Sequence, residues 1–169
     1  RGKETVMALL NSPLLVPELV MGLALLQIIA LLLLEPSILT LTLGHILVCV
    51  PYVVRTMHAA IQGIDASVEE AAASLGAGRL QLYRTVVLPM VRPALYVSLL
   101  FAFLMSFDNA VLSLFLVSAR MQTLPISVYN YVQYSLDPAI AAVSTMLMAV
   151  SVLALFLASR LLPMERLGR

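Results

Sequence analysis

The sequence predicts an all-α integral membrane protein with about four transmembrane helices, and three observations support that fold class. Of its 169 residues, 62% are hydrophobic and only 11% are charged, and the mean hydropathy is +1.02; soluble domains do not have this balance. Several apolar runs are long enough to cross a bilayer, which takes about 20 helical residues. One long polar interval, from Ser67 to Pro89, separates two of these runs.

The first two apolar runs predict the first two spans. The first extends from Leu14 to Leu34 and contains one acidic residue, Glu18. This carboxylate is near enough to the interface to reach water or to pair, and the alternative is a role at a helix–helix contact. The second run extends from about Ile38 to Val54, and Pro51 should bend its helix. We expect residues 56–64 to continue that helix toward the polar interval.

The polar interval predicts a short helix, a glycine turn and a second helix that lies near the membrane surface. Ser67 and Glu70 have the spacing of a capping box at the start of the first helix. A narrow apolar stripe follows at helical spacing: Val68, Ala71, Ala72 and Leu75. Gly76 suits the left-handed position that ends a helix. The second helix is expected from about Arg79 to Val87, with Pro89 ending it.

The third apolar run, Ala94 to Val117, carries an aspartate at its centre. An ionised carboxylate at mid-span costs about 2.5–3.5 kcal/mol on insertion scales, so Asp108 should face the bundle interior or water. Its role is either in a substrate path or in packing, as a buried carboxylate satisfied by a partner. Residues 118–138 are expected to form an external connection with a short interfacial helix and tyrosines at headgroup level. The last span is expected from about Ala139 to Leu162.

The distribution of basic residues predicts the orientation of these spans. With the polar interval inside, only Arg120 lies outside, and such an asymmetry is typical of membrane proteins. Both ends of the chain are then cytoplasmic. The basic residues on the inner side are Arg1, Lys3, Arg55, Arg79, Arg84, Arg92, Arg160, Arg166 and Arg169.

The polar interval also carries a spaced motif. Glu70-Ala71-Ala72, Gly76, Val86 and Leu88-Pro89 are separated by three residues, nine residues and one residue. This pattern resembles the EAA loop of bacterial ABC importer permeases, the binding-protein-dependent inner-membrane components. In that family the loop is cytoplasmic, and its helix docks in a groove of the ATPase. The resemblance implies a coupling loop at residues 65–92. The coupling residues it implies are Glu69, Glu70, Ala71, Ala72, Leu75, Gly76, Leu88 and Pro89.

The resemblance also implies partners and a location. A permease of this kind would lie in the bacterial inner membrane as a multi-pass protein, in contact with lipid. It would work with ABC ATPase subunits, a second permease chain and an extracytoplasmic solute-binding protein. Residues 1–169 would form a single transmembrane domain. Because such permeases usually have about six spans, the chain is expected to be truncated at its N-terminus, with two upstream spans missing.

The C-terminal half resembles that of spermidine/putrescine permeases. Ser106-Phe107-Asp108, then Thr123-Leu124-Pro125, an aromatic stretch and Asp137-Pro138 follow the order seen in those proteins. Asn109 stands where many relatives carry a second acidic residue. A cationic polyamine needs a carboxylate and aromatic faces along its path. The residues assigned to a substrate pathway are Phe107, Asp108, Asn109, Tyr129 and Tyr131. Ferric iron, sulfate and molybdate are the alternative cargoes.

Other functions have little support in the sequence. A net charge of +1 without a basic cluster does not favour nucleic-acid binding. We expect no catalytic residue, metal site or cofactor, since no phosphate loop, nucleophile elbow or metal-ligand spacing is present. Within the spans, Glu18, His45 and Asp108 lie at different predicted depths, and His45 is interpreted as a hydrogen-bonded packing residue, with a ligand role as the alternative. The alternative to a transport subunit is an integral-membrane enzyme or a structural subunit of a complex.

Overall fold

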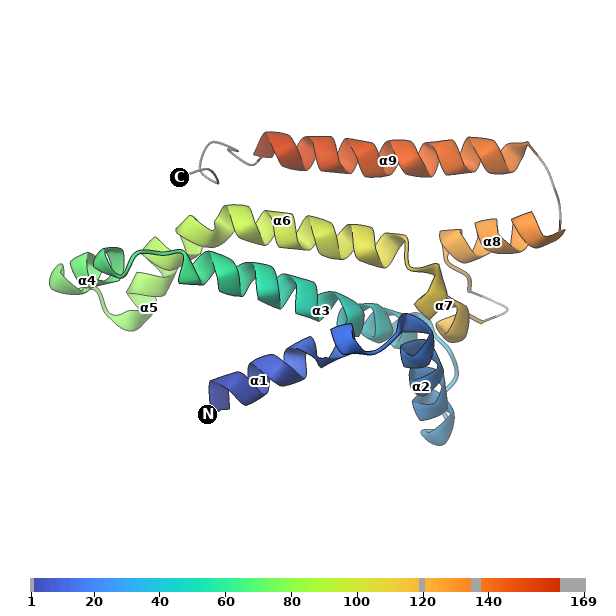
Figure 1. Ribbon diagram of the computed structural model, residues 1–169, viewed down its shortest axis with the longest axis horizontal. Coiled ribbons are helices and arrows are strands. Elements are labelled where there is room, and N and C mark those ends of the chain that lie inside the picture. The colour runs from blue at the N-terminus through green and yellow to red at the C-terminus, as the bar shows by residue number, and fades with distance from the viewer. Residues whose placement is uncertain (1, 119–120, 135–137, 162–169) are drawn as a thin grey trace.

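The computed structural model describes residues 2–118, 121–134 and 138–161, and these residues are almost entirely helical (Figure 1). Three helices are long and apolar enough to cross a membrane, and a bent pair of helices makes a fourth candidate. The predicted fold class, an all-α membrane protein with about four spans, is therefore confirmed. Six residues used in the sequence argument lie outside the described residues: Arg1, Arg120, Asp137, Leu162, Arg166 and Arg169.

The first predicted span is not one straight helix. Helix α1 (Gly2–Asn11) and a 3₁₀ turn (Ser12–Leu15) meet α2 (Glu18–Leu31) at an angle of 105°. The cause is local, because a residue that precedes proline is pushed out of the helical region. Val16, before Pro17, is extended, with ψ at 126°. The expectation of a continuous run from Leu14 to Leu34 is thus wrong, and Glu18 begins a new helix.

Helix α3 (Ile38–Gln62) follows and packs along α6 (Leu88–Phe107) (Figure 1). It starts at a capping box in which Ser37 and Thr40 exchange side-chain and backbone bonds. Pro51 lies inside the helix and is fully buried. The helix continues well beyond Arg55, as the sequence predicted, and leads to the polar end of the molecule.

The polar interval folds at that end as α4 (Ala66–Ser74) and α5 (Arg79–Leu82) (Figure 1). The sequence analysis expected Pro89 to end the second helix, and that expectation is wrong. A π-helical turn (Tyr83–Val87) joins α5 to α6, and together they form one helix over Arg79–Phe107. Pro89 has no N–H to donate to the preceding turn, and the π turn instead bonds the Leu88 N–H to the carbonyl of Tyr83.

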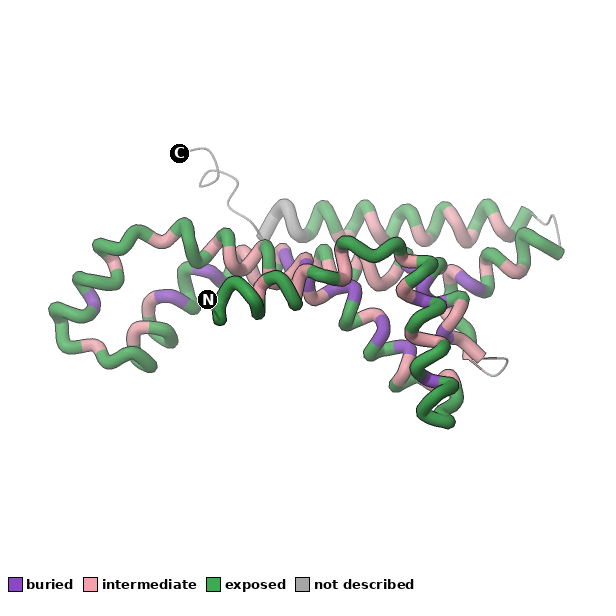
Figure 2. Tube along the Cα trace, turned by 60° about the horizontal axis from the view of Figure 1, so that its bottom comes forward, coloured by how far each residue is buried: buried purple, intermediate pink, exposed green. Residues whose placement is uncertain are grey.

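The third predicted span also ends elsewhere. Helix α6 stops at Phe107, and a short helix, α7 (Ala110–Leu116), leaves it in a new direction. Helix α7 packs on α2 and α3, and their contact forms the main apolar core (Figure 2). The buried members of that core are Ile29, Leu41, Val48, Leu112 and Leu116. Asp108 is therefore at a helix break, where the sequence had placed it inside a span from Ala94 to Val117.

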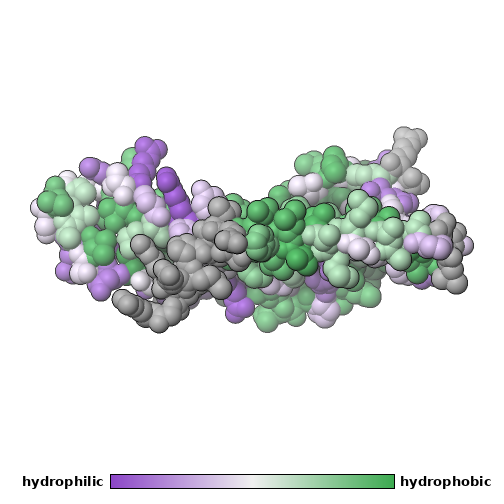
Figure 3. All heavy atoms as spheres, turned by 90° about the horizontal axis from the view of Figure 1, so that it is seen from above, coloured by the Kyte–Doolittle hydropathy of each residue, from purple (hydrophilic) through white to green (hydrophobic). Residues whose placement is uncertain are grey.

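Two helices complete the chain. Helix α8 (Leu124–Tyr134) confirms the short helix expected in the external connection, and α9 (Ala139–Leu161) lies against α6 and α8. None of the apolar window of α9 is buried within the chain. Hydrophilic residues gather around α4 and α5, whereas apolar residues cover the middle of the molecule (Figure 3). This surface pattern suits a protein that lipid and other chains surround.

Candidate functional site

A large cavity lies where α2, α6, α7, α8 and α9 meet. Its volume is about 850 Å³. Four of the five residues predicted for a substrate pathway line this cavity: Phe107, Asp108, Asn109 and Tyr129. Tyr131 does not line it, because residues two apart on a helix point in different directions. The sequence motif and the helix α8 tyrosine are therefore brought together by the fold, although they are about 20 residues apart in the chain.

The helix break gives Asp108 and Asn109 different positions. Asp108 is the C-cap of α6, its N–H bonds the last carbonyls of that helix, and its side chain is exposed. Asn109 is the N-cap of α7, and its Oδ1 accepts a bond of 2.9 Å from the N–H of Leu112. Asn109 is only 8% exposed. Asn109 is thus buried and hydrogen-bonded, whereas Asp108 is an exposed residue that lines the cavity.

Glu18 is a cavity residue that the sequence did not assign to the pathway. The bend at Pro17 turns α2 so that Glu18 lines the same cavity as Asp108. The Nδ2 of Asn109 donates a hydrogen bond of 3.4 Å to the Oε1 of Glu18. Because this bond joins α2 to the start of α7, it supports the alternative considered for Glu18, a role at a helix–helix contact. One feature of the sequence could have indicated this position: Glu18 is the single acidic residue of its apolar run and directly follows Pro17.

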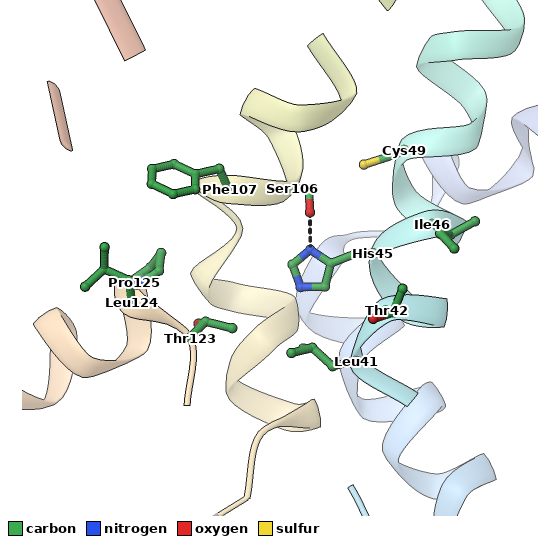
Figure 4. A pocket seen from close by; sticks show the side chains of 10 residues that line it. All are labelled: Leu41, Thr42, His45, Ile46, Cys49, Ser106, Phe107, Thr123, Leu124 and Pro125. Atoms are coloured by element: carbon green, nitrogen blue, oxygen red, sulfur yellow. Dashed lines mark hydrogen bonds between the residues drawn. The ribbon is translucent and has the colours of Figure 1, made fainter. Parts of the chain in front are cut away.

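His45 connects three helices beside the break (Figure 4). Its Nδ1 lies 2.9 Å from the Oγ of Ser106 in α6, and its Nε2 lies 3.0 Å from the Oγ of Ser113 in α7. The expected hydrogen-bonded packing role of this residue is met by these contacts. A second cavity, of about 380 Å³, lies on this side of the break. Phe107 and Pro125 line both cavities and stand between them.

Helix α4, at the end of the molecule where the polar interval folds, is the second candidate region. Asp65 caps this helix by accepting a bond of 2.8 Å from the N–H of Ser67, so the predicted capping box of Ser67 and Glu70 is wrong. The helix starts two residues earlier than expected, and of the two glutamates only Glu69 lies in its first turn. Hydrogen bonds from the backbone and side chain of Ser67 lower the pKa of the Asp65 carboxyl.

The apolar stripe of α4 divides between two faces. Ala72 is buried and Val68 half-buried, whereas Ala71 is exposed. Leu75 is 89% exposed at the C-terminal end of the helix. Gly76 has φ at +82°, which confirms the left-handed turn predicted there. The glutamates at 69 and 70 also face solvent. Helix α4 therefore offers an exposed surface of small, apolar and acidic side chains at the tip of the molecule.

Comparison with known proteins identifies the family. The profile of the binding-protein-dependent transport system inner membrane component matches residues 1–164. The chain belongs to this family. Its members are inner-membrane components of transport systems, which agrees with the apolar helices described above and with the resemblance drawn from the EAA pattern.

The individual relatives are also permease proteins of transport systems. The chain is 31% identical over 166 residues to the spermidine/putrescine transport system permease protein PotC of Escherichia coli (strain K12), covering 98% of this chain and 62% of PotC. It is 31% identical over 154 residues to the putrescine transport system permease protein PotI of the same strain, covering 88% and 55%. It is also 32% identical over 123 residues to the sulfate transport system permease protein CysT of Salmonella typhimurium, covering 71% and 44%. The chain thus spans less than two thirds of the length of these relatives.

Proposed function

We propose that this chain is a permease subunit of an ATP-driven importer and that it forms part of a pathway for polyamines such as putrescine and spermidine. One observation carries this proposal: Asp108 and Glu18 line the same cavity as the aromatic rings of Phe101, Phe107 and Tyr129. The names of PotC and PotI support the cargo class. No covalent chemistry is assigned to the chain.

The chemistry of the cavity suits an extended organic cation. Carboxylates attract the ammonium groups of a polyamine, and aromatic faces attract the same charge through cation–π contacts. A volume of about 850 Å³ is within the usual range of small-molecule sites. Within this motif the sequence supplies one carboxylate, that of Asp108. Glu18 supplies a second carboxylate from a different helix.

Sulfate is the competing cargo, since CysT is also a relative. The described lining of the cavity contains two acidic residues and no lysine or arginine. A divalent anion would be repelled by those carboxylates and would find no cationic partner there. The electrostatics of the cavity therefore favour the polyamine proposal over the sulfate alternative.

The cargo is tested by uptake of labelled putrescine into vesicles that contain the assembled transporter. Asp108→Asn and Glu18→Gln should each raise the KM about tenfold, because each removes one charge that faces the cation. Glu35→Gln is the matched control, since Glu35 lies outside the cavity in the loop before α3. Excess sulfate should not compete. An unchanged KM in both cavity variants, or competition by sulfate, would contradict the assignment.

The second part of the proposal concerns coupling. We assign ATPase docking to the exposed surface of α4 and its glycine turn, with Glu69, Glu70, Ala71, Leu75 and Gly76 at the contact. Ala72 supports the helix from its buried side, and Leu88 and Pro89 belong to the helix that leads into the membrane. Movement of α4 would then pass through α5 and the π turn to α6 and the break. A second permease chain and an extracytoplasmic binding protein complete the proposed assembly.

Leu75 provides a direct test of docking, because its side chain has no packing role in the chain that its removal could disturb. Leu75→Asn should reduce co-purification of the ATPase and ATP-dependent uptake, since an exposed leucine that becomes buried contributes about 2 kcal/mol. Leu33→Asn is the matched control: Leu33 is 93% exposed but lies in the α2–α3 loop, far from α4. Undiminished co-purification of the Leu75 variant would exclude this surface as the contact.

A further inference from the structure

We propose that His45 is a positioning residue, which clamps the two helices on either side of the 108–109 break and so holds Asp108 at the cavity wall. This inference rests on the proposed function of the cavity. His45 itself does not line the cavity that contains Asp108. It acts from the opposite side of the break, through two serines, and would therefore never touch the transported cation.

The clamp joins the last turn of α6 to the second turn of α7. Ser106 lies two residues before Asp108, and Ser113 lies five residues after it. The imidazole of His45 contacts both hydroxyls, at 2.9 and 3.0 Å, from a third helix. Figure 4 shows the contact with Ser106. Ser113 is fully buried. A change in the angle between α6 and α7 would break at least one of these two bonds.

The directions of the bonds can be assigned. Ser113 has one hydroxyl proton, and it donates that proton to the carbonyl of Asn109 at 2.6 Å. The same oxygen can therefore only accept from His45, so Nε2 carries the imidazole proton. In the neutral ring Nδ1 is then an acceptor, and the hydroxyl of Ser106 donates to it. Three bonds in one direction link α6 to the backbone of the break, and such chains strengthen one another.

Asp108 needs such support because its own side chain is not held. Among the described residues, its carboxylate accepts no hydrogen bond, and it is exposed to the cavity. Its neighbour differs, since the side chain of Asn109 bonds both Leu112 and Glu18. The position of the Asp108 carboxylate is thus set by the backbone of the break. The hydrogen bonds of the clamp connect the two ends of that backbone segment, from Ser106 through His45 and Ser113 to the Asn109 carbonyl.

The experiment measures putrescine uptake by the assembled transporter carrying His45→Phe, which keeps a planar ring and removes both bonds. The KM should rise by up to about tenfold, the effect expected for loss of the Asp108 charge itself, while Vmax and co-purification of the ATPase remain. His45→Gln, which can still donate to Ser113, should recover part of the loss. Thr42→Val is the matched control, because that hydroxyl lines the same small cavity but bonds only its own helix, at Ile38. Ser106→Ala provides a milder variant if His45→Phe does not assemble.

A double-mutant cycle separates positioning from general packing. In the Asp108→Asn background, His45→Phe should change the KM by less than about twofold, because the charge that His45 positions is already absent. An equal effect in both backgrounds, or no effect in either, would overturn the clamp while leaving the polyamine pathway in place. If Asp108→Asn and Glu18→Gln alone leave uptake unchanged, the proposed function fails, and this inference fails with it.

Discussion

Replacing Asn109 by aspartate tests the electrostatics of the cavity most directly. The aspartate keeps the oxygen that caps α7 at Leu112, so the helix break should persist. The amide that donates to Glu18 is lost, however, and a carboxylate oxygen takes its place at a separation of about 3.4 Å. Two like charges at that distance repel by about 1 kcal/mol in bulk water and about 5 kcal/mol at an effective dielectric of 20.

The variant should therefore be less stable than the parent when no cation is present. A bound polyamine would neutralise the pair, so spermidine should stabilise the variant more than the parent by a similar amount. The assay is the midpoint of thermal unfolding of the purified complex, measured with and without saturating spermidine. Uptake measured in parallel should show a lower KM for the variant.

Asn130→Asp is the matched control for this experiment, because Asn130 lies on α8 but outside the lining of the cavity. It adds the same charge and should show no extra response to spermidine. Equal stability of the Asn109→Asp variant and the parent, with equal responses to spermidine, would refute the reasoning. It would mean that Glu18 and residue 109 are not neighbours in the assembled protein.

Two further predictions concern the fold that supports these regions. Asp65→Ala should speed amide hydrogen exchange in α4 severalfold at neutral pH, whereas Ser67→Ala, which keeps the backbone donor, should have a smaller effect. Because the pKa of Asp65 is lowered, the cap is complete above pH about 4 and is lost as the pH falls through the lowered value. Gly44→Ala should lower the unfolding midpoint, since its Cβ would lie 2.5 Å from the Cδ1 of the fully buried Leu116. Overpacking costs about 1–3 kcal/mol, whereas the higher helix propensity of alanine over glycine returns about 1 kcal/mol. Gly78→Ala is the control, because a Cβ at Gly78 would meet open space.

The sequence predicted the elements better than it predicted their ends. Apolar length locates helices that can span a membrane, and those that form α3 and α9 were recognised nearly in full. The misplaced boundaries share a cause, because hydropathy does not register where a helix breaks within an apolar run. Val16 before Pro17 and the pair of caps at 108–109 are such breaks. Pro89 shows the opposite error, since a π turn lets the helix continue past it.

The candidate site was predicted in part for the same reason. A motif read along the chain brings together Phe107, Asp108 and Asn109, but it cannot show what a distant helix adds. Glu18 reaches the cavity only because α2 turns by 105° after the 3₁₀ segment. His45 reaches Ser106 and Ser113 only because α6 and α7 pass the same face of α3.

The charge of the cavity is therefore a property of the fold more than of the motif. The side chain of Asn109 carries no charge, but its amide donates to Glu18 at 3.4 Å and so keeps a second carboxylate in the cavity that Asp108 lines. An aspartate at 109 would add charge and at the same time repel the glutamate that supplies it from α2. The amide is thus consistent with a site that attracts a cation with two carboxylates and keeps one of them hydrogen-bonded when no cation is present.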